Sequence, residues 1–125
     1  MAELRMALRR FLAATDEVTR AEGLTPRQYD LLALLHAPSP HVSPSAIADA
    51  LCLSRSATTE LLSRAADAGL VHHALDAGDA RFKQIVATKE GSRRFFAAVN
   101  SLRAERTRLL ELLAAAAGIA ASLSI

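Results

Sequence analysis

Residues 53–70 read LSRSATTELLSRAADAGL, and this stretch predicts a short helix with a defined beginning and end. Ser54 is a favourable N-cap residue, and Gly69 readily takes the left-handed conformation that commonly ends a helix. Four apolar or small residues recur with helical spacing and should face a core: Thr58, Leu61, Leu62 and Ala65. The opposite side begins with hydroxyl and basic residues, most of them poor helix formers, so this end of the helix is expected to contact something outside the chain.

Three further helices are predicted before this stretch. The first covers residues 3–21, carries an apolar face and ends at Gly23. In LTPRQYDLLALL (24–35), Thr25 is an N-cap, Pro26 occupies the first helical position and Gln28 completes a capping box, which predicts a helix over 26–36. SPSAIADAL (43–51) repeats the signal with Ser43 as N-cap and predicts a helix over 44–51.

After Gly69 the hydrophobic period changes from helical to alternating. LVHHAL (70–75) and RFKQIVAT (81–88) alternate around the turn signal DAGD (76–79), which predicts a β-hairpin. A very short strand at His41-Val42 is expected to pair nearby. Thr88 should cap one long helix from Lys89 through the alanines before Gly118, where we expect the helix to end or break.

Composition restricts the class of protein. The 125 residues are 51% hydrophobic and 4% aromatic, with 15 Lys and Arg against 13 Asp and Glu. This size fits one domain, no apolar run reaches the length of a membrane span, and a cytoplasmic location is expected. Few aromatic residues argue against a stacking platform for single-stranded nucleic acid. No nucleophile–base–carboxylate set or phosphate loop is present, so we predict neither an enzyme nor a cofactor.

Two short helices joined by a tight turn and followed by a hairpin predict a mainly α, winged helix-turn-helix fold. The helix after Ser54 would then be the recognition helix, entering the major groove of double-stranded DNA by its N-terminal end. Hydroxyls, arginine and the helix dipole at that end suit phosphate oxygens and base edges. Glu60 must accept from a cytosine amino group, pair with an arginine or point away. The candidate DNA-binding residues are Ser43, Ser45, Ser54, Arg55, Ser56, Thr59, Glu60, Ser63, Arg64, Arg81 and Lys83.

In order along the chain, LTPRQYDLLALL, SPSAIADALCLSRSATTELLSRAADAGLV and DAGDARFKQIVATKEG resemble the MarR (multiple antibiotic resistance regulator) family of bacterial transcription factors. The resemblance spans residues 24–91 and implies a ligand-responsive homodimeric repressor with a wing in the minor groove. It implies dimerisation helices at 1–22 and 89–125 and a DNA-binding lobe at 24–88. The family's wing commonly carries Asp-x-x-Asp-Arg-Arg; here Asp76, Asp79 and Arg81 match, whereas Ala80 replaces the first arginine. Arg81, Lys83, His72 or His73 would then share its role.

The terminal helices carry more apolar residues than one small core needs, which predicts a dimer interface, with ordinary core packing as the alternative. These residues are Leu4, Leu8, Phe11, Phe95, Phe96, Leu109, Leu110, Leu113 and Ile119. Two-fold symmetry would match a near-palindromic operator. The resemblance also implies a pocket for a small aromatic ligand, with Phe11, Tyr29, Leu32 and His36 as candidate lining residues that could equally serve as core.

Two other functions remain open on the sequence. A protein-interaction module on the same winged-helix fold is favoured mildly by Ala80 and Glu60. A metal-responsive regulator would use His36, His41, Cys52, His72 and His73, but their spacing matches no tight ligand motif, so no metal site is predicted. Cys52 could sense oxidation, although we expect a small buried residue in the turn between two helices.

Overall fold

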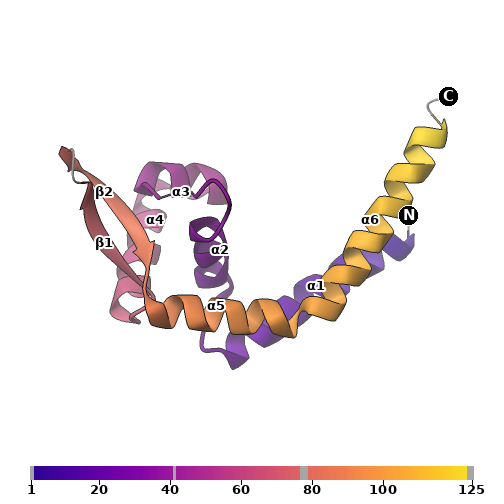
Figure 1. Cartoon of the computed structure of the whole chain (residues 1–125), viewed down its shortest axis with the longest axis horizontal. Coiled ribbons are helices and arrows are strands. Elements are labelled where there is room, and N and C mark those ends of the chain that lie inside the picture. Colours follow the sequence, from indigo (N-terminus) through magenta and orange to yellow (C-terminus); the bar gives the residue numbers. More distant parts are fainter. Residues whose placement is uncertain (1, 41, 77–78, 124–125) are drawn as a thin grey trace.

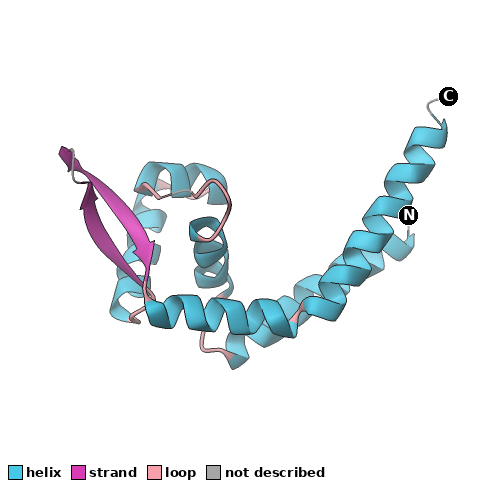
Figure 2. Cartoon of the chain, in the orientation of Figure 1, coloured by secondary structure: helices cyan, strands magenta, loops and turns pink. Residues whose placement is uncertain are grey.

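The computed structural model describes residues 2–40, 42–76 and 79–123, and side chains for all of these except 75, 76, 79–83 and 119–123. Six helices and one hairpin follow in the order α1 (Ala2–Ala21), α2 (Pro26–Leu35), α3 (Pro44–Leu51), α4 (Arg55–Asp67), β1 (Val71–Asp76), β2 (Asp79–Ala87), α5 (Lys89–Ser101) and α6 (Arg103–Leu123). In Figure 1, α2, α3, α4 and the hairpin gather at one end, while α1 and α6 extend together from the other. The mainly α, winged helix-turn-helix prediction is confirmed (Figure 2).

The helix caps predicted from the sequence are present. Thr25 Oγ1 accepts from the Gln28 N–H and the Gln28 side chain accepts from the Thr25 N–H, which completes the capping box of α2. The hydroxyls of Ser43, Ser54 and Thr88 accept from the first turns of α3, α4 and α5. These bonds satisfy N–H groups that a helix cannot satisfy itself, and they fix where each helix begins.

One hydrophobic core holds the helix-turn-helix and the hairpin together. It consists of Leu24, Leu31, Leu32, Ile47, Leu62, Ala65, Leu70, Val71, Ile85 and Phe95. The core face predicted for α4 is correct, because Thr58, Leu62 and Ala65 are buried and Leu61 is half-buried. Gly69, at φ +76°, ends α4 as predicted, and the Leu70 N–H closes the turn onto the Ala65 carbonyl.

The hairpin pairs antiparallel, from Val71 opposite Ala87 to Asp76 opposite Asp79, with a register shift between Leu75 and Asp76. The Val42 carbonyl accepts from the Ile85 N–H at 2.7 Å, so the chain before α3 does lie against β2, although Val42 forms no strand. His41 and the two middle residues of the DAGD turn lie outside the described residues.

The long C-terminal helix is broken at Leu102 and not at Gly118, which contradicts the sequence-based prediction. Leu102 is buried, with its N–H shared between the carbonyls of Ala98 and Val99, and the axis bends there between α5 and α6 (Figure 1). Arg106 Nη1 donates to the Val99 carbonyl at 3.2 Å and so satisfies an oxygen near the break. Gly118 lies within α6, since a glycine lowers helix stability without forcing a break.

The beginning of α5 is held by an ion-pair cluster. Arg93 donates to both carboxylate oxygens of Glu90, at 2.9 and 2.6 Å, and Arg94 donates to the same carboxylate at 3.0 Å. Arg94 also reaches the Gly23 carbonyl at 3.3 Å, which links α5 to the turn between α1 and α2. Hydrogen bonds from Arg93 and then Arg94 lower the pKa of Glu90 from 4.5 to about 2.

Because the folded pKa of Glu90 lies below its unfolded value, this cluster stabilises the fold above pH 4.5 and ceases to do so as the pH falls towards 2. The free energy of unfolding of Glu90→Gln should therefore be lower than that of the wild type at pH 7, with the gap closing in that acid range. Denaturant titrations of both proteins at several pH values measure this gap in the free energy of unfolding. Because the cluster lies at the surface and is open to solvent in part, 1 M salt should also narrow the gap. A gap independent of pH would contradict this assignment.

Candidate nucleic-acid interface

The N-terminal end of α4 lies open to solvent, as the sequence predicts. Ser54, Arg55, Ser56 and Thr59 are all exposed, and none of them contributes to the core. The backbone there is fixed from within, because the Ser54 hydroxyl accepts from the Ala57 N–H and the Thr58 hydroxyl donates to the Ser54 carbonyl. The structure therefore presents a capped, uncovered helix N-terminus with polar side chains around it.

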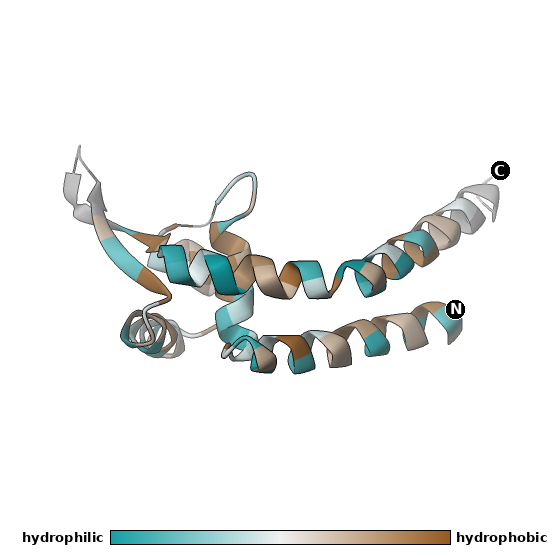
Figure 3. Cartoon of the chain, turned by 60° about the horizontal axis from the view of Figure 1, so that its bottom comes forward, coloured by the Kyte–Doolittle hydropathy of each residue, from teal (hydrophilic) through white to brown (hydrophobic). Residues whose placement is uncertain are grey.

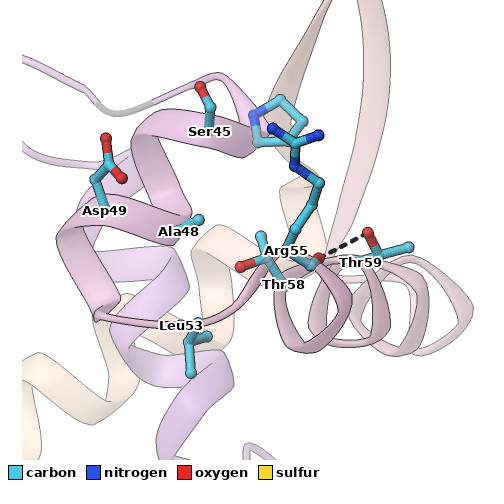
Figure 4. Close-up of a pocket in the computed structure, with 8 residues that line it drawn as sticks. Ser45, Ala48, Asp49, Leu53, Arg55, Thr58 and Thr59 are labelled. Carbon is cyan, nitrogen blue, oxygen red and sulfur yellow. Dashed lines mark hydrogen bonds between the residues drawn. The ribbon is translucent and has the colours of Figure 1, made fainter.

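Arg55 and Thr59 form one side of a groove between α3 and α4. The groove has a volume of about 500 Å³ and is lined by Pro44, Ser45, Ala48, Asp49, Leu53, Arg55, Thr58 and Thr59. In Figure 4 the Arg55 side chain extends away from α4 alongside the beginning of α3, where Ser45 lies. The Arg55 carbonyl accepts the Thr59 hydroxyl at 3.0 Å, so towards a ligand Thr59 offers lone pairs and a methyl group.

The structure resolves the position of Glu60. Its carboxylate lies 2.6 Å from the Arg64 guanidinium, one helical turn away, with the two side chains 62% and 74% exposed. In the chain without DNA, Glu60 therefore pairs with an arginine. Ser63, on the same outward side, is exposed as well.

The candidate residues outside α4 differ in how exposed they are. Ser43 is half-buried as the cap of α3, and Ser45 is exposed in its first turn. Arg81 and Lys83 belong to β2, but their side chains lie outside the described residues. His73 lines a second groove with Thr59 and Ser63, which brings the base of the hairpin next to the exposed face of α4.

One residue of this surface was not foreseen from the sequence. Arg27, in the first turn of α2, lines a third groove with Glu60 and Arg64, and its Nη1 lies 3.5 Å from the Leu51 carbonyl. Only the tertiary packing of α2 beside α4 brings it there, so no local sequence signal could have identified it.

Three of the four candidate ligand-pocket residues belong to the packing between α2 and α5. Leu32 is fully buried, and Tyr29 and His36 pack on Phe95, with ring centroids 5.4 and 4.8 Å apart. His36 Nδ1 lies 2.7 Å from the Leu32 carbonyl, and its Nε2 lies 2.9 Å from the Ser92 hydroxyl. Burial raises the pKa of Tyr29. Phe11 is half-buried on α1.

Cys52 corrects one expectation. It occupies the turn between α3 and α4, but it is exposed, not buried, because this tight turn places it in the left-handed conformation at φ 55° with its side chain outward. In the part of the chain that the structure describes, no three His, Cys, Asp or Glu side chains gather to hold a metal ion. Within the same residues, no helix has the length and apolar character of a membrane span.

Taken together, the helix-turn-helix, the exposed start of its second helix and the adjoining hairpin define a winged helix-turn-helix of the DNA-binding class. Residues 22–81 match the model of the MarR family. The chain is 30% identical to CouR from Rhodococcus jostii RHA1, solved bound to p-coumaroyl-CoA, over 86% of this chain and 76% of that one, with a TM-score of 0.71. A MarR family regulator from Rhodococcus sp. RHA1 is 29% identical over the same shares, with a TM-score of 0.66.

The fold is also that of S. aureus MepR, solved as a complex with DNA, with 23% identity, coverage of 96% of this chain and 91% of that one, and a TM-score of 0.71. A comparison with curated protein sequences gives no match. The chain belongs to the MarR family of DNA-binding transcription regulators, which are not enzymes.

Proposed function

We propose that this regulator is a ligand-responsive homodimeric repressor that binds near-palindromic duplex DNA through the beginning of α4. The observation that carries the proposal is the exposure of Ser54, Arg55, Ser56 and Thr59 on a backbone fixed by its own caps. Preorganised hydroxyls and an arginine at a helix N-terminus suit both phosphate oxygens and base edges. Ser43 and Ser45 would contact the DNA backbone from the beginning of α3. Arg81, Lys83 and His73 would contact the DNA from the wing.

Residues 24–88 would form the DNA-binding lobe, and 1–22 and 89–125 would form the dimer. Support for the second assignment comes from exposed apolar side chains on the terminal helices: Met6, Leu8, Leu12, Phe96, Leu110 and Leu113. Phe95, in contrast, belongs to the core, because α2 covers it. None of the described side chains of α6 is buried, so this helix of 21 residues packs on α1 with much of its apolar surface uncovered. Figure 3 shows how hydrophobic and hydrophilic residues alternate along α1 and α6.

A small aromatic ligand is the proposed effector. CouR, at 30% identity, was solved with p-coumaroyl-CoA. In this chain the cluster of Tyr29, His36 and Phe95 lies where the DNA-binding lobe meets α5. An aromatic ligand inserted there would alter the angle between the DNA-binding lobe and α5. Phe11 and Leu32 would line the same site. Phenolic acids and their CoA thioesters, added to a preformed DNA complex, test this by releasing the DNA.

Selection of bound duplexes from a random pool, followed by salt titration, tests DNA binding. We expect an enriched near-palindrome and a Kd that rises steeply with salt, because Lys and Arg displace counterions from phosphates. Arg55→Ala should weaken binding by about 1–3 kcal/mol, roughly 5- to 150-fold. Arg20→Ala removes the same charge from the exposed end of α1 and is the matched control. No enrichment and a flat salt response would favour a protein-interaction module instead.

A further inference from the structure

Glu60 occupies an unfavourable place for a carboxylate if α4 enters DNA. It lies in the second turn, between Ser56 and Ser63 on the outward side of the helix, and it is 62% exposed. A carboxylate near the phosphates is repelled by them unless a cation offsets its charge. The folding of α4 does not require the residue, because exposed ion pairs contribute little to stability. The ion pair alone therefore does not explain why a carboxylate stands on this face.

The neighbours of Glu60 make a role in DNA binding physically possible. Arg64 holds the carboxylate at 2.6 Å, and Arg27 lines the same groove from α2. The pair with Arg64 carries no net charge, so it can approach the DNA without the repulsion that an isolated carboxylate would meet. The guanidinium also restricts the carboxylate to one side of the helix, which reduces the entropy lost when it meets a base.

We infer that Glu60 is a specificity-determining residue that accepts a hydrogen bond from the N4 amino group of a cytosine in the operator, with Arg64 as its positioning residue. This inference rests on the proposed function. In the major groove cytosine offers an amino donor, and neither guanine nor thymine offers one. Adenine also has an amino group, but its adjacent N7 acceptor would repel a carboxylate. A G·C pair should therefore be preferred at the position that Glu60 contacts.

The test compares Glu60→Ala with Asp67→Ala by selection from a random pool and by Kd on single duplexes. Asp67 is exposed and lies two turns further along the same outward side, so its replacement removes the same charge from the same helix. For Glu60→Ala we expect the preference for C over T at one position per half-site to fall by roughly tenfold, with the other positions unchanged. Asp67→Ala should leave every preference unchanged.

Salt titration provides a second readout. Without Glu60, Arg64 becomes available to a phosphate, so the slope of log Kd against log salt should steepen by about 0.9. For Arg64 itself, Arg64→Ala should weaken the preference for cytosine, and Arg64→Lys should restore part of it. An Arg64→Ala protein with an undiminished preference would overturn the positioning role.

The inference about Glu60 is overturned if the wild type selects a motif and Glu60→Ala selects the same motif with equal discrimination. A wild-type motif without a required G·C pair overturns it too, while the proposed function stands. If the wild type binds no duplex preferentially, the proposed function itself fails, so the two failures are distinguishable.

Discussion

Leu110→Glu should convert the proposed dimer into a monomer and weaken its binding to a two-half-site duplex by about 100-fold or more. Leu110 is 58% exposed on α6 in the single chain, so the substitution leaves the core of the subunit intact. In a dimer the leucine would be buried, and its loss together with the desolvation of a charge would cost several kcal/mol of association free energy. A monomer then contacts one half-site only and loses the second set of contacts.

Sedimentation equilibrium measures the association, and titration of a fluorescent duplex measures the affinity. Ala104→Glu is the matched control, because it adds the same charge to the same helix on the side opposite Leu113. The control should remain a dimer and bind DNA as the wild type does. A dimeric Leu110→Glu protein with undiminished affinity would show that the terminal helices do not pair as proposed.

Gly91→Ala should destabilise the fold by about 3 kcal/mol, because α5 begins too close to the end of α4 for any side chain. A Cβ atom at Gly91 would lie 2.1 Å from the Leu70 carbonyl oxygen. That carbonyl cannot move freely, since it accepts from the Thr88 N–H at 2.9 Å, and the Thr88 hydroxyl also bonds to Gly69. Relief of the clash would therefore break the junction that joins α4, the hairpin and α5.

Denaturant unfolding at one fixed protein concentration measures the loss of stability, because the proposed dimerisation would make stability depend on concentration. Gly118→Ala is the counterpart within α6, where an added Cβ meets nothing within 4 Å. It should stabilise the protein by up to about 1 kcal/mol through helix propensity. Equal stability of Gly91→Ala and the wild type would contradict the packing described at this junction.

Where the fold follows from local chemistry, the sequence predicts it closely. Each of the helices α2, α3, α4 and α5 begins directly after a residue whose hydroxyl caps it, and all four caps were predicted correctly. The break at Leu102 depends on burial of that side chain against other helices, and no proline or glycine marks it. At Gly118 the reverse holds, because the glycine predicted the end of a helix and α6 continues through it.

The candidate DNA-binding site also contains some features that local sequence predicts and others that it does not. The exposure of Arg55 and Thr59 follows from helical periodicity and was predicted. For Glu60 three options were open, and in the chain without DNA it forms an exposed ion pair with Arg64, one helical turn away. The position of Arg27 depends on how α2 packs beside α4, and the outward placement of Cys52 depends on the left-handed turn, so neither could be derived from local sequence.

In the proposed complex, two copies of the exposed beginning of α4 contact duplex DNA about one helical turn apart. The most direct test inserts five base pairs between the half-sites of the selected operator, which moves one half-site to the opposite face of the duplex. We predict that the affinity falls to that of an unrelated duplex of equal length. An affinity unchanged by the insertion would contradict paired recognition by α4.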